Sequence, residues 1–167
     1  MPRSFFFLPL LLALAACDSG TDACEPGQPE SGQLTLCVTG AYELEAVGSF
    51  ATVETGAQVS SLHTGDVESG GRVGAFLSFA PPTDDGLDAR RYPVGTQLPL
   101  LPGTVFLSFT YDDFAETIVT FESVSGAVEV DAVEQGEANT LALTGSFDVT
   151  ARTGDGEREV RLVGRFR

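Results

Sequence analysis

Two runs of alternating apolar and polar residues end the chain: LALTGSFDVTA (residues 141–151) and EVRLVGRF (residues 159–166). They flank TGDGE (residues 153–157). Successive side chains of a strand point to opposite faces, so each run predicts a strand with one buried face. An Asp-Gly between two such runs is the strongest short-range signal of a β-hairpin. The end of the chain is therefore predicted to be an antiparallel hairpin.

The register of this hairpin follows from parity. The apolar residues lie at odd positions in the first run and at even positions in the second. Both sets can face one core only if the loop holds an even number of residues, because a one-residue slip turns a face outward. A two-residue turn at Asp155 and Gly156 meets this condition, whereas a turn at Gly154 and Asp155 would place two glycines opposite each other. The first turn predicts the pairs Val149–Leu162, Phe147–Gly164, Gly145–Phe166 and Arg152–Glu159.

The rest of the chain repeats this pattern in short segments. Candidate strands span residues 34–38, 42–54, 57–62, 72–79, 97–101, 105–111, 116–122 and 127–133, with Gly, Pro, Asp and Ser in the breaks. No segment after the first sixteen residues keeps the 3.6-residue apolar period of a helix. We therefore expect one all-β domain over residues 34–167, an antiparallel β-sandwich of about 8–10 short strands, with a small closed β-barrel as the alternative.

A glycine and a phenylalanine two residues apart recur in four of these segments: Gly48 and Phe50, Gly74 and Phe76, Gly145 and Phe147, Gly164 and Phe166. Two residues apart in a strand share a face. We interpret the recurrence as one packing device used four times, in which glycine lets the strand coil and phenylalanine fills the corner. An aromatic-lined ligand pocket is the alternative interpretation.

The chain begins with features of an export signal. A short basic start, MPRS, precedes an apolar run at residues 5–14 that is too short to span a bilayer permanently. Residues 1–16 are therefore predicted to be a signal peptide. Leu14-Ala15-Ala16-Cys17 resembles the bacterial lipobox, which implies that Cys17 becomes the mature amino terminus and carries fatty acyl chains such as palmitate. An ordinary signal peptide with a coincidental cysteine is the alternative, and Asp18 leaves the choice between inner and outer membrane open.

Residues 17–33 are polar, rich in Pro and Gly, and without periodicity, which is typical of a flexible tether. The tether contains Cys24, and Cys37 lies in the first candidate strand. Cys37 points away from the face of Leu34, Leu36 and Val38, so it can reach back to the tether without disturbing the core. An exported protein meets an oxidising compartment. A disulfide between Cys24 and Cys37 is therefore expected, with two unpaired thiols as the alternative.

The chain is strongly acidic. It carries 24 Asp and Glu against nine Arg, no Lys, and a net charge of −15. Such a surface repels nucleic acid and anionic lipid, so we expect no nucleic-acid partner. Arg161, Arg165 and Arg167 gather near the end of the chain. They predict either a docking stripe or the solvated outer face of the last strand, paired with acids on its neighbours.

Several short patterns carry a resemblance to a known group. They are Tyr92-Pro93-Val94-Gly95, Ser125-Gly126-Ala127-Val128-Glu129-Val130, Gly145-Ser146-Phe147-Asp148-Val149-Thr150-Ala151 and the closing Gly164-Arg165-Phe166. Together they are similar to a loose group of uncharacterised bacterial lipoproteins, over roughly the second half of the chain. Arg91 departs from the small or hydroxyl residue that the group often has before the tyrosine. The resemblance implies an all-β fold and a lipid-anchored location, and no activity.

Catalytic and metal-binding patterns are sparse. His63, with Ser60 and Ser61 nearby, is the chain's one histidine and is expected in an exposed loop rather than in a triad. Asp84, Asp85 and Asp88 come closest to a calcium loop but lack the EF-hand spacing, so a solvated turn is preferred. Asp112 and Asp113 are expected to cap a turn. No cofactor motif occurs.

These observations predict a lipid-anchored protein of a bacterial cell envelope with a non-catalytic binding or structural β domain. The alternatives are a carrier of a small apolar ligand with a cavity inside a closed sheet, and, less favoured, a hydrolase. We expect the membrane as a partner through Cys17. The sequence identifies no protein or small-molecule partner.

Overall fold

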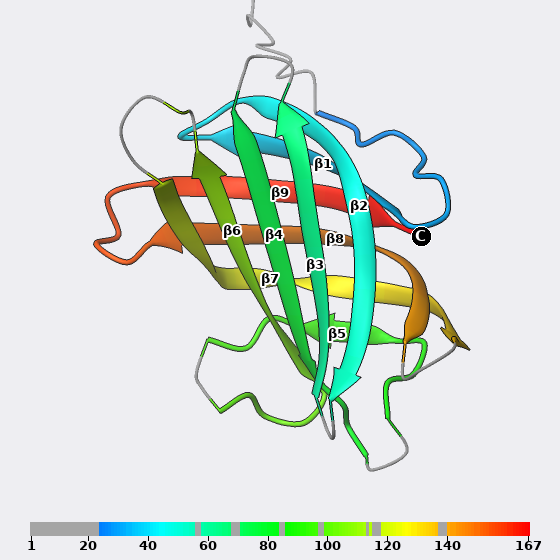
Figure 1. Ribbon diagram of the computed structural model, residues 1–167. Helices are drawn as coiled ribbons and strands as arrows, with labels where there is room; N and C mark the ends of the chain where they lie inside the picture. The colour runs from blue at the N-terminus through cyan, green and yellow to red at the C-terminus, as the bar shows by residue number, and fades with distance from the viewer. Residues whose placement is uncertain are drawn as a thin grey trace, which may run out of the picture.

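A computed structural model of the chain shows an all-β protein (Figure 1). It describes residues 24–55, 58–67, 71–83, 86–96, 99–112, 114, 118–136 and 140–167, and of residues 54–55, 58–64 and 66–67 it describes the backbone only. Nine strands cover most of these residues: β1 (Gln33–Gly40), β2 (Leu44–Thr55), β3 (Gln58–Val67), β4 (Arg72–Ala80), β5 (Arg91–Pro93), β6 (Thr104–Asp112), β7 (Ile118–Gln135), β8 (Leu141–Thr153) and β9 (Glu159–Phe166).

All nine strands belong to one curled antiparallel sheet. Their order is β5-β7-β6-β4-β3-β2-β1-β9-β8, and β7 also pairs with β8, so the hydrogen-bonded neighbours form a ring. Figure 1 shows two crossed layers: β2, β3, β4 and β6 run steeply in front, and β1, β9, β8 and most of β7 run across behind them, with β5 below; the first residues of β7 pair with β6. We call these the front layer and the back layer. The prediction of an all-β, antiparallel fold is confirmed. The sheet has two packed layers, as in the predicted sandwich, and it also curls, as in the alternative prediction of a barrel.

Side chains fill the space between the layers. Alternate residues of the strands are buried there, among them Leu34, Leu77, Leu107, Val128 and Leu162. Aromatic rings touch within this core: Phe50 and Phe166 at 4.9 Å between centroids, Phe79 and Tyr92 at 5.3 Å, and the cross-strand neighbours Phe109 and Phe121 at 5.9 Å. These separations are typical of favourable aromatic pairs. The aromatic residues therefore stabilise the fold by packing on one another.

The closing hairpin has the predicted register. Phe147 lies opposite Gly164 and Gly145 lies opposite Phe166, with Arg152 opposite Glu159. The rings occupy the space above the glycines: a Cβ added at Gly164 would lie 2.6 Å from Cε1 of Phe147, and one added at Gly145 would lie 2.6 Å from Cζ of Phe166. Each ring covers the glycine across the strand, which replaces the packing that a glycine in a strand loses.

The prediction of a two-residue turn is wrong, although the prediction that the loop holds an even number of residues is confirmed. The strands stop at Thr153 and Glu159, and Thr153 N donates to Arg158 O at 3.0 Å. Inside this pair, Gly156 N donates to Thr153 O at 2.8 Å, and Asp155 Oδ1 accepts from Glu157 N at 3.0 Å. Gly156 has a φ of +74°, which favours glycine. The loop therefore holds four residues, because the side chain of Asp155 stabilises a wider turn than the strands alone require.

Two further strand predictions are wrong. Residues 116–122 and 127–133 were expected as separate strands with a break at Ser125 and Gly126. From Ile118 onward they form the single strand β7, which pairs with β8 through register shifts at Ser123/Ser125 and Val130/Ala132. Gly126, at a φ of +111°, absorbs the first bulge, where a Cβ would overlap the backbone of Asp148.

The segment 97–101 is not a strand where it is described, at residues 99–101. The short strand β5 lies just before it instead and pairs with β7 from Arg91 to Pro93. Pairing between β6 and β7 ends at Ser108 and Glu122, and beyond that point β5 lies against β7. Leu107 N donates to the buried Ser123 Oγ at 3.0 Å, which satisfies a backbone group near the separation. Three residues are too few for alternation to reveal such a strand.

The Gly-x-Phe device is used fewer times than predicted. Phe50, Phe147 and Phe166 are buried in the core, but Phe76 is 38% exposed on the outer face of β4. The alternation of β4 explains this difference, because Val73, Ala75, Leu77 and Phe79 take the inward positions. The interpretation of the Gly74 and Phe76 pair as core packing is therefore wrong.

The packing of the hairpin predicts that Gly164→Ala destabilises the domain. The added methyl group overlaps the ring of Phe147, and overpacking of this kind costs about 1–3 kcal/mol. Gly154→Ala is the matched control, since nothing lies within 4 Å of the added carbon there. Urea unfolding of both variants measures the effect. Equal stability of Gly164→Ala and the parent protein would show that the ring does not lie over the glycine.

Candidate functional site

A wide groove lies on the outer face of the back layer. Its volume is about 1150 Å³, and strands β1, β5, β7, β8 and β9 line it together with the start of β2 and the segment that precedes β1. We call it the back groove. Its charged side chains include Arg91 of β5, Glu129 of β7, Asp148 of β8, and Arg161 and Arg165 of β9. They occupy outward positions of strands whose alternate residues fill the core, so the hydrophobic alternation of the sequence also aligns these charges.

Two ion pairs cross the strands of the groove. Arg161 donates two hydrogen bonds to Asp148, Nε to Oδ1 at 2.9 Å and Nη2 to Oδ2 at 2.7 Å. This bidentate hydrogen bonding is the main reason that the pKa of Asp148 lies below its usual value, and it also raises the pKa of Arg161. Arg91 Nη1 lies 2.9 Å from Glu129 Oε1, directly across the strand pair.

Arg165 differs from these two arginines. It is half-buried, and its guanidinium has no hydrogen bond or ion pair with the residues that the structure describes. Three further carboxylates line the groove, Glu43 and Glu45 beside β1 and Glu25 from the segment that lies over β1. Among the described residues, the groove thus combines a cation that has no ion pair with carboxylates that no arginine holds. The sequence suggested either a docking stripe or a solvated, paired face for the last strand. Arg161 is paired as the second interpretation predicts, and Arg165 is not.

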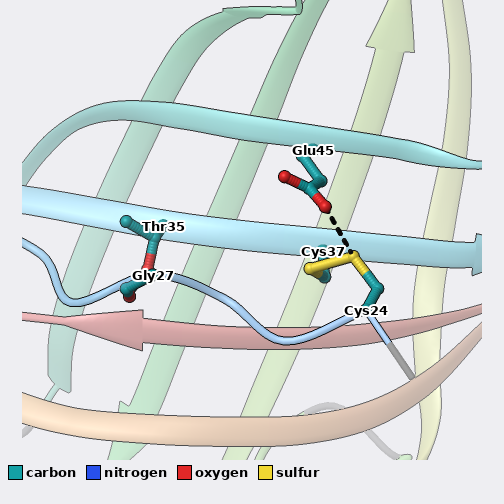
Figure 2. The surroundings of a disulfide bond; sticks show 5 residues. All are labelled: Cys24, Gly27, Thr35, Cys37 and Glu45. Atoms are coloured by element: carbon teal, nitrogen blue, oxygen red, sulfur yellow. Dashed lines mark hydrogen bonds between the residues drawn. A yellow bond between two sulfur atoms is a disulfide. The ribbon is translucent and has the colours of Figure 1, made fainter. Parts of the chain in front are cut away.

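A disulfide joins Cys24 and Cys37, and both residues line the groove (Figure 2). The two Cα atoms are 5.7 Å apart, and Cys37 is 2% exposed. Thr35 Oγ1 donates to Gly27 O at 2.7 Å, so residues 24–27 lie along the outer face of β1. This cover explains why residues 34–38 are all buried, although alternate ones point away from the core. The predicted disulfide is present, and Cys37 points outward as expected.

Glu45 lies next to this disulfide. Its Oε1 is 3.5 Å from Cys24 Sγ, as the dashed line in Figure 2 marks. The two cysteines and Glu45 have the residue types and proximity of a metal site, with ligand atoms within 4.8 Å of one another. Both sulfurs are bonded to each other, however, and a metal ligand must be a thiolate. With the disulfide formed, this cluster of the described residues is not a metal site.

The remaining sequence candidates are not brought together. Cys17 and the signal peptide lie outside the described residues, as do Asp84, Asp85 and Asp113. Asp88 is used structurally, because its Oδ1 accepts a hydrogen bond of 2.7 Å from the hydroxyl of the buried Tyr92 and pairs with Arg90 at 3.3 Å. The pKa of Tyr92 is raised to about 12, mainly because the residue is buried and secondly because of this hydrogen bond to Asp88. Asp88 thus holds the turn before β5. The calcium interpretation of the full triplet stays untested.

The loop prediction for His63 is wrong. His63 lies inside β3, where it pairs with Phe50 of β2 and Ala75 of β4, and Ser60 and Ser61 lie in the same strand. The apolar alternation of the sequence ends at Leu62, but the strand continues through Thr64 and Gly65 because both neighbouring strands pair with it there. Asp112 does cap a turn, since its Oδ1 accepts from Phe114 N at 2.9 Å.

Comparison of the chain with protein-family models, curated proteins and solved structures found no match. Within the part of the chain that the structure describes, no helix is long and apolar enough to cross a membrane.

The disulfide predicts a measurable loss of stability on reduction. A bridge between residues 13 apart stabilises a protein by about 3 kcal/mol in the chain-entropy estimate. The double variant Cys24→Ser, Cys37→Ser should therefore unfold at a lower guanidinium concentration than the parent protein. Reductant should lower the midpoint of the parent and leave that of the double variant unchanged. An unchanged unfolding midpoint of the parent protein in reductant would contradict the contribution of the disulfide to stability.

The Asp148–Arg161 pair predicts a dependence on pH. The folded-state pKa of Asp148 is depressed, so the ion pair contributes fully to the free energy of unfolding above the unfolded pKa near 3.9. This contribution is lost as the pH falls through the folded pKa. The side chains are 58% exposed, which limits the contribution to less than about 1 kcal/mol. Carboxyl titration by NMR should show the pKa of Asp148 rising in Arg161→Gln and unchanged in Arg152→Gln, since Arg152 pairs with Glu159 instead. An unchanged pKa in Arg161→Gln would contradict the pairing.

Proposed function

We propose that the chain is a lipid-anchored protein of a bacterial cell envelope, and that its β domain is a non-catalytic binding module whose binding face is the back groove. The anchor is the acylated Cys17, so the membrane is one partner. The lipobox-like sequence before Cys17 and the resemblance to bacterial lipoproteins support this part of the proposal. The choice between the inner and the outer membrane stays open.

The back groove is the observation that carries the binding role. It spans several strands and is lined by charges of both signs, among them Glu25, Glu43 and Arg165, the last without an ion pair to the residues that the structure describes. An open groove suits an extended ligand better than a small enclosed one, because small-molecule sites bury most of their ligand. We therefore favour an extended chain that carries both cationic and anionic groups, such as a peptide segment. The acidic surface outside the groove disfavours nucleic acid.

The packing of the core weighs against the carrier function. That function needs an apolar cavity between the layers, and buried aromatic pairs such as Phe50–Phe166 and Phe79–Tyr92 occupy this space. The hydrolase function has less support as well. Within the groove, Asp148 and Glu129 are each held by an arginine, so neither carboxylate is placed as a free acid or base.

The anchor is tested by Cys17→Ala. This change should block lipid attachment, and globomycin should block processing of the parent chain in the same way. Cell fractionation should then show the parent in membranes and a substantial part of the Cys17→Ala domain released or unprocessed. Ser19→Ala, two residues away, serves as the control and should fractionate as the parent does. Undiminished recovery of processed Cys17→Ala protein in membranes would overturn the lipid anchor.

The binding face is tested with a synthetic peptide of alternating lysine and glutamate residues. It should shift the backbone amide resonances of Ser146, Val163 and Arg165 in the purified protein. Arg165→Glu should weaken the binding by about fivefold to tenfold, as the loss of one charge-assisted contact implies. Arg167→Glu, with the same change of charge outside the groove lining, should have little effect. Shifts elsewhere, or equal effects of both variants, would contradict the groove as the binding face.

A further inference from the structure

The outer face of the front layer differs from the back groove in its charge. The outward positions of β2, β4 and β6 hold small, hydroxyl-bearing and apolar residues: Ser49, Ala51, Val53, Gly74, Phe76, Ser78, Ala80, Thr104, Phe106, Ser108 and Thr110. None of these eleven residues is charged. We call this surface the neutral face. Such a surface is unexpected on a chain in which 20% of the residues are charged.

The backbone register aligns the neutral face in rows across the four strands. Ala51 pairs with Leu62, Leu62 with Phe76, and Phe76 with Ser108. In the next row, Ser78 of β4 pairs with Phe106 of β6. Large apolar side chains are exposed on this surface, with Val53 53% and Phe76 38% accessible. Exposed apolar side chains on a surface without charges are typical of a protein interface.

A hollow lies at one end of the neutral face. Its volume is about 490 Å³, and it is lined by Gly65 of β3, Gly74 of β4, Thr110 of β6 and the exposed Ile118 of β7. Gly74, at an outward position, leaves the sheet without a side chain there. The exposed Val53 and the partly buried Phe106 lie at the opposite end of the strands. Apolar knobs at one end and a hollow at the other are complementary when a second identical face is turned by 180° about an axis across the strands.

Charge favours a second copy as the occupant. In a twofold interface the same patch lies on both sides, so a net charge at its centre would face its own copy. With a net charge of −15, the chain can approach itself closely only where the surface is free of such charge. Arg72 and Asp112 lie opposite each other on β4 and β6 and line the hollow itself, and their opposite signs allow pairing there rather than repulsion.

The size of the face fits a small interface. The neutral face covers four strands about 4.8 Å apart and about seven residues along each strand, which gives roughly 20 Å by 25 Å of sheet. Projecting side chains add further surface to this area. Specific interfaces bury about 600–800 Å² on each partner at the lower end of their range. We propose that two copies of this chain pack face to face through the neutral face, with the strands of the two front layers antiparallel.

Cysteine cross-linking of the full chain in intact cells tests this proposal. Ala51→Cys lies in the central row, and Ala89→Cys, on the connection before β5, is its matched control because both alanines are exposed. A short bis-maleimide should give a dimer of Ala51→Cys, seen on denaturing gels in membrane and released fractions alike, so the result does not depend on the anchor. The parent protein and Ala89→Cys should remain monomers.

A second substitution then shows whether the face itself makes the contact. Phe76→Glu, added to Ala51→Cys, places two like charges in the interface and should lower the dimer yield by at least about tenfold. Val124→Glu on β7 is the control, because Val124 is 36% exposed against 38% for Phe76. Absence of an Ala51→Cys dimer, an equal yield from Ala89→Cys, an unchanged yield in Phe76→Glu, or a cross-link to a different protein in place of the dimer would each overturn the proposal.

Discussion

The reciprocal packing of two phenyl rings over two glycines is the constraint on which the closing hairpin and its neighbours depend. Phe147 covers Gly164, and Phe166 covers Gly145. Only one register of β8 and β9 gives both contacts. Because β9 then pairs with β1 and β8 pairs with β7, this register also sets where both ends of the sheet meet. A local contact between four residues thus determines how the curled sheet closes.

The hairpin could be predicted because its information is local. Alternation identifies the strands, and the parity of the loop limits their register, so the pairs such as Val149–Leu162 follow without knowledge of the rest of the fold. The width of the turn could not be predicted in the same way, since the side chain of Asp155 accepts a hydrogen bond from Glu157 N within the loop, and alternation does not reveal this bond. The position of Phe76 was predictable in principle. The alternation of Val73, Ala75, Leu77 and Phe79 already places it on the other face.

The remaining differences depend on contacts between distant segments. Whether Ser125 and Gly126 end a strand or form a bulge depends on β8, which continues past them and keeps β7 in the sheet. The same holds for His63, which lies in β3 because two neighbouring strands pair with it. The disulfide could be predicted from the orientation of Cys37. The back groove could not, because Arg91 reaches Glu129 only through the insertion of the short strand β5 next to β7.

If Cys17 carries the proposed lipid anchor, the disulfide also limits how far the domain can move from it. A chain extends by at most about 3.5 Å per residue. Without the bridge, the sixteen residue steps from Cys17 to Gln33 at the start of β1 would allow a reach of about 56 Å. With Cys24 bonded to Cys37, only seven steps separate the proposed acylated residue from the body of the domain, which limits the reach to about 25 Å. The covalent bond would therefore limit the reach of a lipid-anchored domain in addition to stabilising its fold.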